Sequence, residues 1–181
     1  FFNGGVEGAY PGEERLLVPS WKGATYDLHP EMSAPQITEE LLRALSRRKY
    51  GALVVNYANA DMVGHTGRVA ETIAAIETLD ECFGRVESAV RQAGAILMMT
   101  ADHGNAEQMI DAETGQPHTA HTTNPVPLVL VNGPEATRLT PGILADVAPT
   151  ILRLQGLPVP SQMTGHDLRA PRAERGGAAG C

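Results

Sequence analysis

The sequence of 181 residues has few aromatic side chains, few cysteines and no excess of basic residues. Aromatic residues make up 4% of the chain, so a core has to be mostly aliphatic. The formal net charge is −7, with no basic stripe to offset it, which argues against a nucleic-acid partner. We see no signal-peptide pattern and no apolar run long enough to span a bilayer, and we expect no membrane partner.

The two cysteines, Cys82 and Cys181, do not indicate a disulfide framework. Cys82 lies within a helical pattern, and Cys181 is the last residue of the chain. This usage fits a reducing compartment, and we expect a cytoplasmic protein. Residues 1–168 have the length and apolar content of one folded unit, whereas 169–181 lack large apolar side chains for packing and are expected to form a disordered tail.

Apolar periodicity and turn residues predict the elements. Ser33 and Gln36 have capping-box spacing at the start of a helix that ends before Gly51, and a long helix from about Val69 to Gln92 is stopped by Gly94. Asp146 is the predicted N-cap of a last helix. The predicted strands are the apolar runs 16–18, 52–57, 95–99 and 127–131.

The alternation of strands and helices predicts an α/β fold: a three-layer α/β/α arrangement around a largely parallel sheet. Asp61 and Asp102 then both lie just past the carboxyl ends of predicted strands. In open α/β sheets that edge is the usual place for ligands.

Three polar clusters could carry chemistry there. Asp61 and His65 stand four residues apart, which places them on one side if the loop contains a helical turn, and Asp102 is followed directly by His103. His118 and His121 stand three apart, and chemistry alone does not choose between them. Each cluster has a plainer interpretation, such as a surface ion pair across a turn or an Asp-His pair that caps a helix. Isolated surface positions are expected for His29 and His166.

Taken together, the clusters offer two carboxylates and up to four imidazoles, without a cysteine. Mixed oxygen and nitrogen ligation suits Mn²⁺ or Zn²⁺, with Mg²⁺ a poorer match for imidazole. Two such cations and two carboxylates would leave about two positive charges, which is a docking point for a phosphate on an acidic chain.

These motifs resemble the family of cofactor-independent (2,3-bisphosphoglycerate-independent) phosphoglycerate mutases, members of the alkaline phosphatase superfamily. The resemblance runs from residue 1 to about 168. The main motifs are NADMVGHTG (59–67), TADHGNAE (100–107) and HTAHTTNPVP (118–127). Shorter ones are FFNGG (1–5), ATYDL (24–28), PEMSA (30–34) and MTG (163–165).

The resemblance implies an isomerase of glycolysis that interconverts 3-phosphoglycerate and 2-phosphoglycerate through a phosphoserine intermediate, with two divalent ions, usually Mn²⁺. It implies one metal held by Asp61, His65 and His121, which selects His121 over His118. It implies a second metal held by Asp102 and His103, together with an Asp and the nucleophilic Ser from upstream. The full-length enzyme is expected to be a monomer.

The chain begins where the family's proteins are already past their midpoint, so it resembles the C-terminal part of the phosphatase-like domain. No serine in it fits the nucleophile, and we therefore expect no catalytic residue, an incomplete second metal site and no mutase activity from these 181 residues alone. An unpaired sheet edge would make the fragment prone to self-association. The alternative is a stand-alone metal-binding or interaction module derived from the enzyme. A hydrolase or phosphopentomutase of the same superfamily is disfavoured by runs 30–34 and 120–127.

Overall fold

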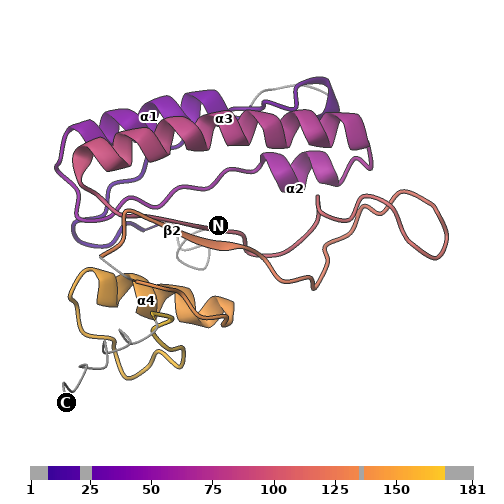
Figure 1. Ribbon diagram of the computed structural model, residues 1–181. Coiled ribbons are helices and arrows are strands. Elements are labelled where there is room, and N and C mark those ends of the chain that lie inside the picture. The colour runs from indigo at the N-terminus through magenta and orange to yellow at the C-terminus, as the bar shows by residue number, and fades with distance from the viewer. Residues whose placement is uncertain (1–7, 21–25, 135–136, 170–181) are drawn as a thin grey trace, which may run out of the picture.

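The computed structural model describes residues 8–20, 26–134 and 137–169, and the fold below concerns these residues. The motif at 1–5, Cys181 and all of the predicted tail except Arg169 lie outside them. Arg169 itself pairs with Leu139 in an isolated antiparallel bridge. Figure 1 shows helices α1 and α3 on one side of the β-strands and α4 on the other.

Helix α1 spans Ala34–Ser46, as the sequence predicts, with a proline in its first turn. The predicted capping box is wrong, because the Ser33 side chain makes no cap hydrogen bond to the helix. Its hydroxyl donates instead to the carbonyl oxygen of Pro19 at 2.9 Å. Ser33 therefore ties the start of α1 to the preceding segment.

Helix α3 spans Val69–Ala93, and Gly94 ends it in the left-handed conformation at φ 67°, which glycine adopts without a Cβ penalty. Both ends agree with the sequence prediction. Not every apolar residue of this helix is buried, since Ile73 and Ile76 are exposed at 53% and 43%. The buried residues are Thr72, Ala75, Leu79, Cys82, Val86 and Val90.

The core joins the two helices to the segment that leads into the site. Ala34, Leu79 and Cys82 form its centre, and Tyr57 and Phe83 pack against it. The Tyr57 and Phe83 rings meet edge to face with centroids 5.4 Å apart. The free thiol of Cys82 is buried there, as expected for a chain without a disulfide framework. Helix α2, Asn59–Gly64, begins two residues after Tyr57, so the packing of Tyr57 helps to position it.

Strands β1, Leu97–Thr100, and β2, Leu128–Val131, form where the sequence predicts strands, but they pair antiparallel, with Leu97 opposite Val131. The largely parallel sheet that the sequence predicts is therefore not confirmed by the two described strands. A parallel pair needs a crossover, usually helical. Residues 101–127 contain no helix, and the chain simply returns alongside β1.

Two further predicted strands, 16–18 and 52–57, are in no ladder within the described residues. Leu17 is 88% exposed and Val54 is 71% exposed. The fold class α/β holds, but the described sheet has two strands. An apolar segment such as 52–57 is thus extended without a partner strand.

The last described region is built around Asp146. A short 3-10 helix, Leu144–Asp146, leads into α4, Val147–Leu154. Asp146 stands at the predicted N-cap, yet its carboxylate makes no cap bond to α4. It accepts instead from the backbone N–H groups of Ile143 at 2.8 Å and His166 at 2.7 Å, which lower its pKa. Another short 3-10 helix, Tyr26–Leu28, lies before α1.

Candidate metal centre

Three segments that are distant in sequence meet beyond the end of β1. They are helix α2, the loop 101–107 after β1, and the loop 118–124 before β2. Gly104 and Thr122 pair across the two loops, and the Thr122 N–H donates to the Gly104 carbonyl oxygen at 2.8 Å. Between them the chain makes a hairpin in which Ile110 pairs with Pro117. Each segment therefore presents its polar side chains to the same place.

Asp61, His65 and His121 converge there. The Oδ1 atom of Asp61 lies 3.1 Å from Nε2 of His65 and 3.2 Å from Nε2 of His121. The two Nε2 atoms are themselves 3.1 Å apart. The pair Asp61 and His65 meet because α2 places residues four apart on one side. Three potential ligand atoms thus form a nearly equilateral triangle.

The other ring nitrogen of His65 decides what its Nε2 atom can do. Nδ1 of His65 lies 2.6 Å from the carbonyl oxygen of Thr119. A carbonyl oxygen only accepts, so Nδ1 carries the proton, and in the neutral ring Nε2 presents a lone pair. That lone pair faces the Asp61 carboxylate, and two acceptors at this distance repel unless a cation lies between them.

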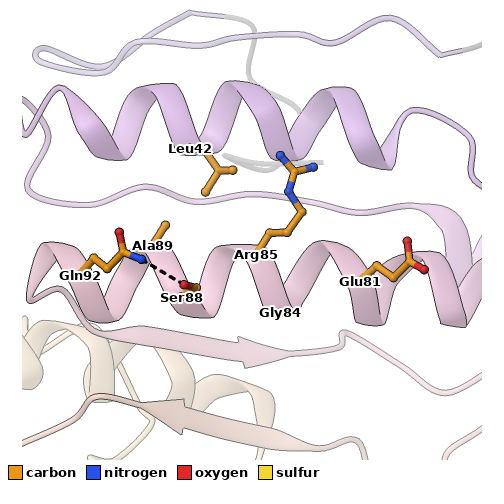
Figure 2. A pocket seen from close by; sticks show the side chains of 7 residues that line it. All are labelled: Leu42, Glu81, Gly84, Arg85, Ser88, Ala89 and Gln92. Atoms are coloured by element: carbon orange, nitrogen blue, oxygen red, sulfur yellow. Dashed lines mark hydrogen bonds between the residues drawn. The ribbon is translucent and has the colours of Figure 1, made fainter.

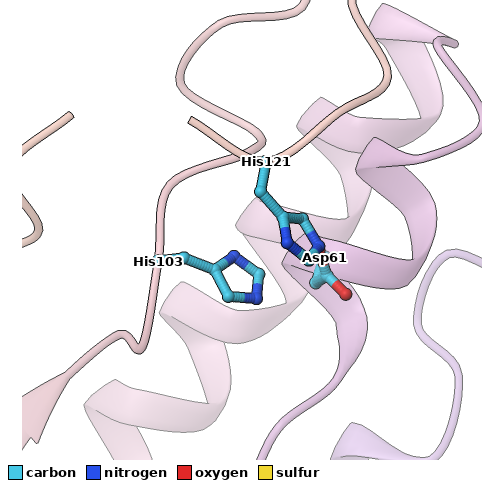
Figure 3. A group of neighbouring side chains, drawn as sticks. All are labelled: Asp61, His103 and His121. Atoms are coloured by element: carbon cyan, nitrogen blue, oxygen red, sulfur yellow. The ribbon is translucent and has the colours of Figure 1, made fainter. Parts of the chain in front are cut away.

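His103 joins the same cluster from the loop after β1. Its ring stacks on the ring of His121 with centroids 3.7 Å apart and planes 19° from parallel. One ligand atom each from Asp61, His103 and His121 lies within 4.8 Å of the others (Figure 3). His103 comes from the loop after β1, His121 from the loop before β2 and Asp61 from α2.

Three of the polar residues noted in the sequence do not converge with this cluster. The Asp102 side chain is 85% exposed, and its Oδ1 atom lies 3.7 Å from Nε2 of His103. His118 lies at the base of the hairpin, where its backbone N–H donates to the Met109 carbonyl oxygen at 2.9 Å. His29 lies next to Glu31, with 3.0 Å between Nδ1 and Oε1. The structure therefore brings His121, and not His118, to Asp61.

Two residues of the site were missed by sequence reasoning, although they lie in the motif 100–107. The side chain of Asn105 is buried, and its Nδ2 donates to Asp61 Oδ1 at 2.8 Å. Glu107 accepts a hydrogen bond from the Asn105 N–H at 2.6 Å and from the Thr122 hydroxyl. Their partners lie 15 and 44 residues away, a pairing that no local pattern encodes.

Hydrogen bonding makes Glu107 a firmly ionised carboxylate. The Thr122 hydroxyl is the main cause, followed by the side-chain amide of Asn124 at 2.9 Å and by backbone N–H groups. These donors stabilise the charged form and lower the pKa of Glu107 to about 2. At neutral pH, Glu107 is therefore an ionised carboxylate that links the two loops through hydrogen bonds.

A groove of about 580 Å³ lies elsewhere, between helices α1 and α3 (Figure 2). Leu42 lines one wall, while Gly84 and Arg85 line the other, and none of the clustered polar residues reaches it. Gly84 has open space where a side chain would be, which widens the groove. We regard it as the furrow between two packed helices and not as a part of the candidate metal centre.

The donor set, a carboxylate with imidazoles on the loops of an α/β fold, defines a metal-binding class of protein. Residues 1–159 match the metalloenzyme superfamily, and the chain belongs to that superfamily. Among the described residues, no helix is long and apolar enough to cross a membrane.

Several similar proteins carry a specific name. The chain is 57% identical over 168 residues to a 2,3-bisphosphoglycerate-independent phosphoglycerate mutase of Cereibacter sphaeroides, and 55% identical over 170 residues to one of Rhodopseudomonas palustris. Each match covers 93% of this chain and 33% of the relative. The chain thus spans about a third of the length of the curated relatives it matches.

A solved structure is also similar to the fold described above. It is a phosphoglycerate mutase of Leishmania mexicana, crystallised at low cobalt concentration. The TM-score is 0.77 at 29% sequence identity, and the match covers 84% of this chain and 31% of the other. The likeness therefore extends over most of this chain and, again, over about a third of its relative.

Proposed function

We propose that the chain supplies part of the metal centre of a phosphoglycerate mutase, an isomerase that interconverts 3-phosphoglycerate and 2-phosphoglycerate in glycolysis. The observation that carries the proposal is the convergence of Asp61, His65 and His121, with His65 held as an acceptor toward the carboxylate. The similarity to enzymes of that name supports the choice of reaction.

The triangle of ligand atoms has the size that a divalent ion requires. With metal–ligand bonds of about 2.1 Å, neighbouring ligands at octahedral or tetrahedral angles lie about 3.0–3.4 Å apart. The three edges here are 3.1, 3.2 and 3.1 Å. A metal-bound imidazole also commonly donates its other N–H to a backbone carbonyl, as His65 does to Thr119. The residues present therefore fit the metal.

We assign Asp61, His65 and His121 to one ion, and Asp102 with His103 to a second ion whose other ligands lie outside this chain. The stacked rings of His103 and His121 put the two sets side by side. Oxygen and nitrogen donors favour Mn²⁺, with Zn²⁺ and Mg²⁺ as alternatives. When bound, such ions offset the negative charge of a phosphoryl group.

The residues of this chain would bind and orient the metal ions, and the nucleophilic serine is expected upstream of this chain. The hydroxyls of Ser33 and Ser46 donate to backbone carbonyl oxygens, and Ser88 accepts from Gln92. None of the five serines, all of them described, has a recorded hydrogen bond to the metal cluster. We accordingly expect no conversion of 3-phosphoglycerate by the 181-residue chain alone.

We also propose that the full-length enzyme is a monomer in the cytoplasm and that its complete sheet is largely parallel. The exposed apolar segment 52–57 is suited to pair with a further strand, and without one it favours self-association of the chain. A stand-alone binding module is not favoured, because the relatives described above carry the name of the enzyme.

A chimera tests the function. The upstream two thirds of the Cereibacter sphaeroides relative would be joined to residues 1–168 of this chain in place of its own matching segment. We expect Mn²⁺-dependent formation of 2-phosphoglycerate from 3-phosphoglycerate. The His121→Ala chimera should be inactive, and the His118→Ala chimera, as the matched control, should stay active. A folded, Mn²⁺-binding chimera that leaves 3-phosphoglycerate unchanged would refute the proposed reaction.

A further inference from the structure

One buried amide holds the Asp61 carboxylate. Nδ2 of Asn105 donates to Asp61 Oδ1 at 2.8 Å and approaches the Asp61 carbonyl oxygen at 3.4 Å. Asn105 is only 4% exposed, whereas the Asp61 side chain is 35% exposed. Both facing groups are acceptors, so the NH₂ end of the amide has to face Asp61.

The opposite end of the amide lies against Gly64. A Cβ on Gly64 would come within 2.4 Å of Asn105 Oδ1. That oxygen is buried and has no hydrogen-bond partner among the described residues. A buried acceptor without a partner is unfavourable for folding, so its presence calls for an explanation other than stability. A requirement for the NH₂ group at Asp61 provides that explanation.

The loop that carries Asn105 is itself tied to the loop that carries His121. The Asn105 N–H donates to Glu107 Oε2 at 2.6 Å. The other carboxylate oxygen of Glu107 accepts from the Thr122 hydroxyl and from Asn124 Nδ2. A continuous chain of hydrogen bonds therefore runs from Asp61 through Asn105 and Glu107 to Thr122, beside His121.

We propose that Asn105 is a positioning residue of the metal centre and that Glu107 links it to the His121 loop. The inference rests on the proposed metal site. The terminal torsion of an aspartate is broad, so the backbone alone does not fix the orientation of the carboxylate plane toward the imidazoles. The donor from Asn105 fixes that orientation before the ion arrives. Such partners of metal ligands are worth about 10–100-fold in metal affinity.

The test measures Mn²⁺ affinity of the full chain by competition with a chelating dye. Asn105→Ala should bind Mn²⁺ about 10–100-fold more weakly, and Asp61→Asn more weakly still. The matched control is Asn132→Ala, which removes a comparable amide that donates to the Ala95 carbonyl oxygen, remote from the metal site. An Asn105→Ala affinity within about twofold of the unmodified chain, alongside a loss in Asp61→Asn, would overturn the inference and leave the proposed site intact. A folded unmodified chain that binds no Mn²⁺ would overturn both.

The visible absorption spectrum of bound Co²⁺ separates positioning from a general structural role. We expect the bands to shift in Asn105→Ala, because the carboxylate is no longer held, and to be unchanged in Asn132→Ala. If Asn105 only stabilised the fold, the melting temperature would fall while the spectrum of the bound ion stayed the same. That result would overturn the inference.

A second variant covers the case in which Asn105→Ala does not fold. Glu107→Gln is nearly isosteric, and we expect it to weaken Mn²⁺ binding by up to about tenfold. Its matched control is Glu113→Gln on the hairpin, with no effect. If both single variants fold, the double variant should lose little more Mn²⁺ affinity than Asn105→Ala alone, because the two residues act through one chain of hydrogen bonds. An unchanged affinity in Glu107→Gln, or losses that multiply in the double variant, would refute the link.

Discussion

The helix pair α1–α3 and the metal cluster are held in place by different forces. The helices meet through buried apolar side chains such as Leu79 and Cys82, and most of their charged side chains lie at the surface. The cluster is partly exposed, and its three segments are held by hydrogen bonds through Asn105 and Glu107. Burial is non-directional, whereas a hydrogen bond fixes an angle. We therefore expect that substitutions can alter the stability of this chain and the geometry of its metal ligands separately.

The largest expected effect is on the helix pair. Leu79→Ala removes a buried side chain from the centre of the core and should lower the free energy of unfolding by about 3 kcal/mol. Chemical denaturation measures it, with Ile76→Ala, a 43% exposed position on the same helix, as the control with a much smaller loss. Mn²⁺ affinity of the folded fraction should be unchanged. A parallel loss of affinity would mean that the two regions are not separable.

The next effect is on the cluster alone. His121→Ala removes a proposed ligand and should weaken Mn²⁺ binding by more than about 100-fold, beyond the range for outer partners of a metal site. His118→Ala, three residues away on the hairpin, should stay within a few-fold. Metal analysis after dialysis against a fixed free Mn²⁺ concentration gives both values. The opposite order would reject the assignment of His121.

Gly64→Ala tests the close contact between α2 and Asn105. Its Cβ would meet Asn105 Oδ1 at 2.4 Å, so the amide has to shift, with a cost of about 1–3 kcal/mol. Mn²⁺ affinity should fall with it. Gly84→Ala in α3 is the matched control: it has open space, and a gain of up to about 1 kcal/mol is expected from helix propensity. Equal behaviour of the two variants would contradict the tight packing around Asn105.

The smallest effect is a dependence on pH. The pKa of Glu107 is about 2 in the folded chain against 4.5 as its ordinary value, so it contributes stability above pH 4.5 that is lost as the pH falls toward 2. The difference in unfolding free energy between the unmodified chain and Glu107→Gln should shrink across that window. Melting curves from pH 6 to pH 2.5 measure it. A difference that stays constant with pH would show that Glu107 is not held as described.

Local features of the fold could be predicted because they depend on neighbouring residues. The bounds of α3 follow from apolar spacing and from Gly94, whose left-handed conformation ends the helix. The approach of His65 to Asp61 follows from their spacing of four once this segment forms a helical turn, which the structure shows as α2. The pairing of β1 with β2 does not follow, because their direction depends on what connects them, and 101–127 contains no helix.

The sequence by itself determined which residues could form a metal site: Asp61 with His65, Asp102 with His103, and one histidine of the pair His118 and His121. The residue pattern left the choice between the two histidines open and the family resemblance implied His121; only the tertiary structure shows that His121 reaches Asp61 and that the Asp102 side chain is exposed to solvent. It also decided that Asn105 supports the carboxylate. The physical reason is the separation along the sequence over which each kind of interaction acts. Helical and strand periodicities act over a few residues, whereas the contacts that bring His121 into the cluster join side chains 18 to 60 positions apart.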